Sequence, residues 1–233
     1  MNPEIINTLS MDLPAFIIGI GLHEFCHAWA ADRLGDPTPR EQGRVSLNPM
    51  EHLDPVGTVM PLMLTAAGSP VAFGWGRPVT VDPARLRPPG LGYGLVALAG
   101  PLGNLLLCLL AGGWFAFTAS SPTLLQALRD PTVNFLYRLL ARVFTMNLGL
   151  LLFNLLPIPP LDGSKVLIWL GGERVRAVMQ RLQTYNLAIF LLMVMTNAHS
   201  QIITPLFLRL THLLTGKLWL HVLRPSQFVL DFL

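Results

Sequence analysis

Seven residues in the first apolar segment carry the strongest chemical signal in this chain and read Gly21-Leu22-His23-Glu24-Phe25-Cys26-His27. On a helix, the imidazoles of His23 and His27 lie one turn apart and about 40° apart around the axis, so both can reach one metal ion. Glu24 lies about 60° beyond His27, close enough to act on a water molecule at that ion. The spacing predicts a helix that binds one Zn²⁺ through two neutral imidazoles and holds a carboxylate beside the open coordination position.

The composition places this motif in a membrane protein. The chain has 233 residues, of which 52% are hydrophobic and 12% are charged, and its mean hydropathy is +0.52. Soluble domains carry about 25% charged residues, so this chain lacks the charge to cover a water-exposed surface. An ordinary cytosolic enzyme, a disordered chain and a disulfide-stapled secreted domain are therefore excluded. Because the 16 Lys and Arg residues form no run, we expect no nucleic-acid partner.

A chance match on a solvated helix face is the alternative interpretation of the motif. The motif lies inside an apolar stretch, 13–31. Each ionisable group there costs about 2.5–3.5 kcal/mol on insertion scales and usually marks a functional site. We therefore interpret the motif as a metal site.

The hydropathy pattern predicts an all-α polytopic membrane protein with about five to six transmembrane helices. A full helical span needs about 20 apolar residues. Stretch 56–73 contains Pro61, Gly68 and Pro70, so we expect it to be re-entrant rather than spanning. The candidate segments, the last of them ambiguous, are 13–31, 56–73, 91–119, 135–156, 187–206 and 207–223.

The connection between the first and third candidates is rich in Pro and Gly. Within it, 43–47 and 77–81 are expected to form short strands of a small β-sheet at the membrane face. We expect one membrane-embedded domain over 1–233, with a catalytic core at about 11–168 and C-terminal helices at about 183–233. No stretch is long and polar enough for a PDZ module.

A third zinc ligand is needed beside the two histidines, and Asp162 is the best candidate. It follows an apolar stretch and three prolines, where the backbone can unwind and the carboxylate can turn inward. The alternative is an ordinary helix-ending turn, because Asp-Gly after proline is common loop chemistry. Spacing alone does not choose between the two interpretations.

Further motifs accompany these residues. They read Asn154-Leu155-Leu156-Pro157-Ile158-Pro159-Pro160-Leu161-Asp162-Gly163, Gly43-Arg44-Val45-Ser46-Leu47-Asn48-Pro49, Gly74-Trp75-Gly76-Arg77-Pro78-Val79 and Ala99-Gly100-Pro101-Leu102-Gly103-Asn104. In combination they resemble the site-2 protease family of intramembrane zinc metalloproteases, as a compact bacterial-type member without a PDZ domain.

The resemblance implies roles for five residues. His23, His27 and Asp162 would bind one zinc ion, and Glu24 would be the general base. Asn154 would hold the substrate strand or help to stabilise the oxyanion. The implied activity is hydrolysis of a peptide bond within or near a transmembrane segment of a membrane-anchored protein, such as an anti-sigma factor or a remnant signal peptide.

The ligand set also constrains topology. Both motifs fall toward the C-terminal ends of their helices, so these helices should run parallel, with one antiparallel span between them. If the last two candidates both cross, 12 Lys and Arg lie on one side of the membrane and four on the other. The positive-inside rule then places the zinc site nearer the cytoplasmic face, and the resemblance implies that the membrane is that of a bacterial cell.

Other residues and functions remain as alternatives. His52 could approach the site, but an interfacial position is expected. Cys26 is interpreted as packing. Gly100 and Asn104 are interpreted as a close helix contact, and the resemblance offers a substrate contact as the alternative for Asn104. A metal-ion transporter would need a chain of ionisable sites along a pathway, whereas here they concentrate in one place. A catalytically silent membrane scaffold would have little need of Glu24 and a complete ligand set.

Overall fold

The computed structural model describes residues 3–66, 74–196 and 198–216, and most of these residues are helical. The elements are α1 (Pro3–Arg33), α2 (Thr38–Glu41), the 3₁₀ helix η1 (Pro49–Glu51), α3 (Pro55–Ala66), α4 (Pro89–Ser120), α5 (Pro122–Ala127), α6 (Pro131–Asn154), α7 (Asp162–Leu170), α8 (Gly172–Gln183), α9 (Asn186–Met195) and α10 (Ala198–Thr215).

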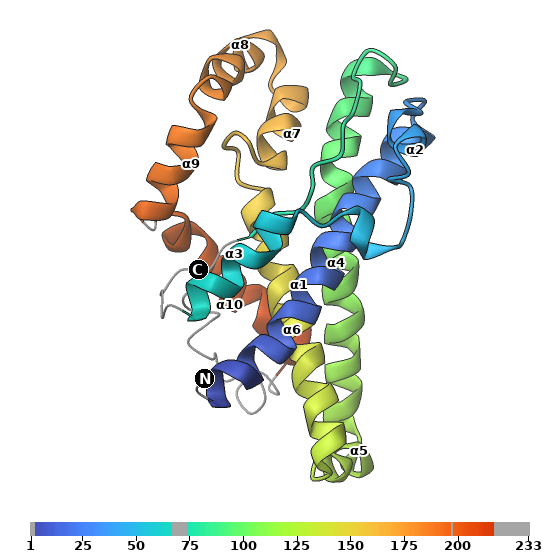
Figure 1. Cartoon of the computed structure of the whole chain (residues 1–233), viewed down its shortest axis with the longest axis vertical. Helices are drawn as coiled ribbons and strands as arrows, with labels where there is room; N and C mark the ends of the chain where they lie inside the picture. The colour runs from blue at the N-terminus through green and yellow to red at the C-terminus, as the bar shows by residue number, and fades with distance from the viewer. Residues whose placement is uncertain (1–2, 67–73, 197, 217–233) are drawn as a thin grey trace.

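Three long helices form the centre of the molecule. Among the described residues, Leu9–Arg33, Gly90–Ser120 and Pro131–Asn154 are long and apolar enough to cross a membrane. They correspond to α1, α4 and α6, and confirm the first, third and fourth of the predicted apolar segments as long helices. Figure 1 shows that α1 and α6 run in the same direction and that α4 runs antiparallel to both, as the ligand argument requires.

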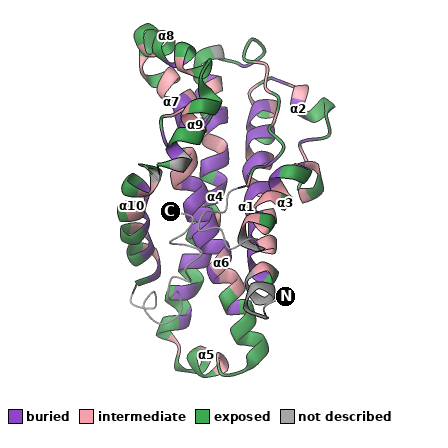
Figure 2. Ribbon diagram, turned by 60° about the vertical axis from the view of Figure 1, so that its left-hand side comes forward, coloured by how far each residue is buried: buried purple, intermediate pink, exposed green. Residues whose placement is uncertain are grey.

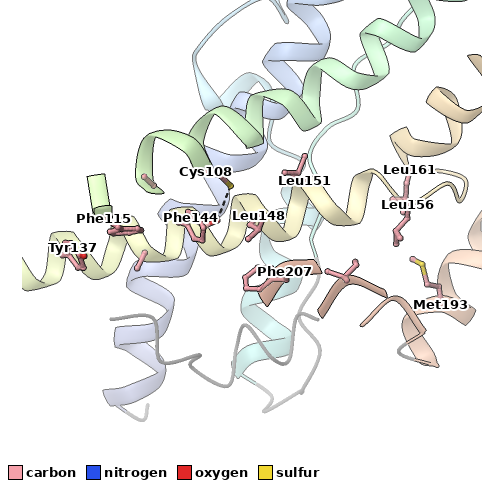
Figure 3. Packing of buried hydrophobic residues seen from close by; sticks show 13 residues of the cluster. Cys108, Phe115, Tyr137, Phe144, Leu148, Leu151, Leu156, Leu161, Met193 and Phe207 are labelled. Carbon is pink, nitrogen blue, oxygen red and sulfur yellow. Dashed lines mark hydrogen bonds between the residues drawn. The ribbon is translucent and has the colours of Figure 1, made fainter. Parts of the chain in front are cut away.

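Helix α4 lies at the middle of the packing. It contacts α1, α6 and α7, and α10 packs against both α4 and α6. Figure 2 shows buried residues along the faces where the long helices meet, with exposed residues at α5 and α8. The largest buried cluster joins α4, α6 and α10 through Phe115, Phe144 and Phe207 (Figure 3). This core fixes α4 and α6, the two helices that surround the motif helix.

Helix α3 is short and lies beside the N-terminal half of α1. It has 12 residues, well below the length of a full span. Leu13 and Phe16 of α1 share a small cavity with Pro61 and Leu62 of α3. The remainder of the predicted re-entrant segment, 67–73, lies outside the described residues.

The expected small β-sheet is not present in the described part of the chain. Segments 43–47 and 77–81 contain no strand, and one isolated antiparallel bridge pairs Leu53 with Gly76. The backbone N–H groups of the second segment have other acceptors: Arg77 donates to the carbonyl of His52, and Val79 donates to the side chain of Glu24. Backbone pairing therefore stops at the Leu53–Gly76 bridge and the Arg77–His52 hydrogen bond, because the next N–H group, that of Val79, bonds to a side chain.

The predicted boundaries of the last two spans are wrong. The stretch 187–206 is not one helix, because α9 ends at Met195 and α10 begins at Ala198. Helix α10 continues across 206–207 because Ile203, Phe207 and Thr211, spaced by four residues, are all buried along one face. With 10 residues, α9 is too short to cross a bilayer as a helix. Residues 217–223 lie outside the described part.

Candidate metal centre

The two histidines of α1 and the distant Asp162 come together at one point. The His23 Nε2–His27 Nε2 distance is 3.1 Å, and Asp162 Oδ2 lies 3.0 Å from His27 Nε2 and 3.3 Å from His23 Nε2. A tetrahedral zinc site with bonds of about 2.0–2.1 Å places its ligand atoms about 3.3–3.4 Å apart. All three residues are buried. The triangle therefore fits one metal ion and leaves a fourth coordination position.

The turn between α6 and α7 brings Asp162 to this point. Asp162 is the first residue of α7, directly after the proline-containing segment 155–161. Gly163 makes the tight approach possible, because a Cβ there would lie within 2.5 Å of the backbone of Leu155. The alternative of a plain helix-ending turn is excluded by the position of the carboxylate against both imidazoles.

The hydrogen bonds behind the imidazoles show what the centre needs. His27 Nδ1 lies 2.7 Å from the carbonyl oxygen of Val96, and His23 Nδ1 lies 2.7 Å from Asn104 Oδ1. Both partners are acceptors, so each Nδ1 carries the proton and each neutral Nε2 carries a lone pair. Two lone pairs and a carboxylate oxygen thus face one another. A single proton could satisfy one of these contacts, whereas one metal ion satisfies all three.

Helix α4 closes the back of the centre. A Cβ on Gly100 would overlap His27 Nε2 and would lie 2.7 Å from His23 Cε1, so only glycine allows this approach. Asn104, one turn further along, is fully buried and holds His23. The sequence indicates a close helix contact for Gly100 and Asn104, and the family resemblance offers a substrate contact for Asn104, but neither points to this role. The signal was their spacing of four residues in an apolar helix, which does not reveal the partner.

Glu24 lies beside the histidines in the wall of a cavity of about 770 Å³. Its Oε2 accepts a hydrogen bond of 3.2 Å from the backbone N–H of Val79, which orients the carboxylate. The cavity is also lined by the three candidate ligands, by 74–81 and, across from them, by α9 through Leu187 and Phe190. A carboxylate, a metal centre and room for a chain segment are therefore adjacent.

Lys165 is a further charged group at the centre that the sequence analysis did not identify. Its Nζ donates to Asp162 Oδ1 over 2.8 Å, while Oδ2 of the same carboxylate faces the imidazoles. Burial alone would lower the pKa of Lys165, but the Asp162 carboxylate outweighs it and raises this pKa above its ordinary value. The Lys165 amine therefore occupies the second oxygen of Asp162.

The other residues singled out in the sequence differ in whether they line the cavity. Asn154 lines the same cavity, and its Nδ2 donates to the carbonyl of Leu150 in its own helix. His52 does not line this cavity: it is fully buried, and its Nε2 contacts the Ser46 carbonyl oxygen. Cys26 packs close to Gly103 of α4, as interpreted.

The His-Glu-x-x-His helix and a distant carboxylate beside it are the residue set expected of a metalloenzyme. Of known proteins, one named "Putative zinc metalloprotease YwhC" from Bacillus subtilis is 35% identical over 190 residues, which is 82% of each chain. Two proteins named Rip2, with the same description, are also similar. That of Mycolicibacterium smegmatis is 29% identical over 78% of this chain and 66% of its own length. That of Mycobacterium tuberculosis is 32% identical over 67% of this chain and 56% of its own length.

No family model and no solved structure matches the chain. The relatives nevertheless cover most of it. The chain belongs to the site-2 protease family of zinc metalloproteases.

Proposed function

We propose that the protein is an intramembrane zinc endopeptidase that hydrolyses a peptide bond in or near the transmembrane segment of a membrane-anchored protein. The observation that carries this proposal is the convergence of two Nε2 lone pairs and one carboxylate oxygen next to Glu24 in a shared cavity. The cavity opens within a bundle of apolar helices, and most of its lining side chains are apolar. An apolar substrate segment would therefore be received without exposing it to water.

The charges support a multi-pass arrangement with the metal centre nearer the cytoplasmic face. Six Lys and Arg lie between 32 and 90, and four lie between 158 and 185. These segments include α2, α7 and α8, which lie at one end of the bundle, whereas α5 lies at the other (Figure 1). The α5 end carries Arg129 and Arg138. The positive-inside rule favours the first end as the cytoplasmic one.

The mechanism follows from the positions of the side chains. Bound by His23, His27 and Asp162, zinc would make water more acidic and polarise a carbonyl group. Glu24, held by the N–H of Val79, accepts a proton from the water that attacks the scissile carbonyl carbon. It then delivers that proton to the amide nitrogen as the carbon–nitrogen bond breaks, so one water molecule is consumed per cleavage.

The substrate must present an accessible carbonyl group. In a helix this group is hydrogen-bonded within the turn, so the segment must unwind locally before attack. Asn154 lines the cavity, and we assign it to the substrate backbone or to the developing oxyanion. Peptides whose apolar span contains a Gly-Gly or Asn-Pro pair should be cleaved faster than peptides with an unbroken apolar helix.

The test compares wild type with Glu24→Gln on labelled single-span peptides in detergent micelles, with zinc content measured on the same samples. The substitution removes the proton acceptor and leaves the ligands intact. We expect the variant to retain zinc and to lose at least about 100-fold in cleavage rate. Glu173→Gln makes the same chemical change on the exposed surface of α8 and should match wild type.

Two outcomes would contradict the proposal. Equal cleavage by wild type and Glu24→Gln would show that Glu24 is not the base. Metal flux into vesicles by wild type, with no cleavage of any peptide, would instead indicate a transporter.

A further inference from the structure

A chain of buried amide groups connects His23 to the backbone of two other elements. Asn104 Oδ1 accepts from His23 Nδ1, while Asn104 Nδ2 donates to Asn147 Oδ1 over 2.8 Å and lies 3.2 Å from the Gly19 carbonyl. Asn147 Nδ2 in turn donates to the Val143 carbonyl over 2.7 Å. These hydrogen-bonded amide groups, the amide relay, thus link α1, α4 and α6.

The direction of every hydrogen bond among these buried amide groups is fixed. The carbonyl groups of Gly19 and Val143 can only accept, so the amide nitrogens of Asn104 and Asn147 must point at them. The oxygen of Asn104 must then face His23, whose Nδ1 has to carry the proton. Reversing either amide would place two acceptors or two donors together in a buried position, which is costly.

Burial makes this arrangement rigid. Asn104 and Asn147 are both 0% exposed and His23 is 4% exposed, so water cannot supply substitute partners. His27 is oriented differently, by the Val96 backbone carbonyl. The Nδ1 atom of His23 is therefore held by a side chain and that of His27 by the backbone, and the contact to His23 depends on Asn104 and, through it, on Asn147.

We infer that Asn104 and Asn147 are positioning residues that hold His23 in the Nδ1–H tautomer and aim its Nε2 lone pair at the metal. The inference rests on the proposed metal centre and goes beyond it. A zinc-bound histidine normally has a carboxylate or carbonyl behind it. An uncharged amide relay does the same work here without adding a negative charge between the helices. Asn147 touches no ligand and acts only through Asn104.

A purely structural alternative exists, because buried polar side chains also join helices in membranes. The two roles differ in what they control. A helix contact affects stability of the metal-free and zinc-bound protein alike. A positioning relay changes zinc affinity and the ligand field, and the effect of Asn147 disappears once Asn104 is gone.

The experiment measures zinc affinity of the purified full chain by competition with a chelator for wild type, Asn104→Leu, Asn147→Leu and the double variant. We expect about a 10–100-fold loss for Asn104→Leu and a smaller loss, about 2–10-fold, for Asn147→Leu, since the Gly19 carbonyl still holds Asn104. The double variant should be no worse than Asn104→Leu. Full additivity of the two losses, or unchanged affinity in both single variants, would overturn the inference.

Thr118→Val is the matched control. Thr118 lies on the same helix α4, is 2% exposed and donates only to the Trp114 carbonyl, about 21 Å along the axis from Asn104. The Thr118→Val substitution removes a buried hydrogen bond without contacting Asn104 or Asn147, so zinc affinity should stay within about two-fold of wild type. A loss as large as that of Asn104→Leu would mean that general weakening of the helix bundle explains the effect.

Two further measurements separate a change at the metal ligands from a general loss of folding. The visible spectrum of the Co²⁺-substituted protein should change in Asn104→Leu and stay unchanged in Thr118→Val, because it reports the ligand geometry. If Asn104→Leu does not fold, Asn104→Ala removes the acceptor behind His23 Nδ1 without adding bulk. It should also bind zinc more weakly, and affinity equal to wild type would refute the relay. A wild type that binds no zinc would refute the proposed metal centre itself.

Discussion

The candidate metal centre leaves room only for glycine at position 100. The residue lies in α4 directly against both imidazoles, and any side chain would occupy the space of His27 Nε2. Such a contact cannot be relieved by a rotamer change, because the imidazoles are held from behind by Asn104 and Val96.

We therefore predict that Gly100→Ala lowers zinc affinity at least about 10-fold and destabilises the fold by about 1–3 kcal/mol, the usual cost of overpacking. Chelator competition and thermal unfolding measure the two effects. Gly113→Ala is the control on the same helix, since nothing lies within 4 Å of a Cβ there, and it should bind zinc normally. Wild-type affinity in Gly100→Ala would show that the imidazoles do not lie as described.

Lys165 is the second residue whose role can be tested directly. It neutralises Asp162 Oδ1 and leaves Oδ2 for the metal centre. Partners of metal-binding carboxylates commonly contribute about 10–100-fold in affinity or activity. We expect Lys165→Met to lower kcat/KM within this range at saturating zinc, and Lys165→Arg, which keeps the charge, to lose less. Equal activity of Lys165→Met and wild type would remove Lys165 from the site.

Among the elements, the end of α1 is held by a carboxylate that lies just beyond it. Asp36 is fully buried and accepts from the backbone N–H groups of Thr38 and Asp82, so it attaches 82–87 to the helix that carries both histidines. Burial alone would raise the pKa of Asp36, but the hydrogen bonds from Thr38 and Asp82 lower it below its ordinary value of 3.8.

The lowered pKa determines the sign of a pH effect. The charged form is favoured in the folded protein, so its stabilisation is complete above pH 3.8 and is lost as pH falls through the lower folded value. We predict that Asp36→Asn is less stable than wild type by about 1.5–3 kcal/mol at pH 7. The difference should shrink as the pH falls below 4. Thermal unfolding from pH 7 to pH 3 measures it, and a constant difference would contradict this role.

The elements that could be predicted from sequence are those whose evidence is local. The histidine pair is four residues apart on one helix, and the apolar runs of α4 and α6 exceed the length of a span, so both could be read from the chain. The break between α9 and α10 could not, because Ile203, Phe207 and Thr211 show their common face only once they pack on the core.

The parts of the site that escaped prediction depend on contacts between distant segments. Asn104 contacts His23 across 81 residues. The segment 77–81 was expected to be a strand, but the acceptors of its N–H groups are the Glu24 side chain and the His52 carbonyl. The family motif around Asp162 predicted that it lies beside the histidines, and the structure brings it there. Its spacing alone left the choice open.

At the scale of the whole molecule, three helices from different parts of the chain combine to make one centre. Helix α1 supplies two imidazoles and Glu24, the α6–α7 turn supplies a carboxylate, and α4 supplies the partners that orient the imidazoles. Helix α4 runs antiparallel to α1 and α6 and packs against both (Figure 1), and the three candidate ligands meet where these elements come together. The proposed chemistry depends on this single arrangement.

Zinc K-edge X-ray absorption on the purified chain, with zinc content determined in parallel, examines that arrangement at the metal. We predict one zinc ion per chain, with two imidazole nitrogens at about 2.0–2.1 Å and a carboxylate oxygen at about 2.0–2.2 Å. Most of the bound zinc should be lost in Asp162→Ala, and the ligand shell of any zinc that remains should change. A sulfur ligand at about 2.3 Å, or an unchanged spectrum in Asp162→Ala, would contradict the assignment of His23, His27 and Asp162 as the ligands.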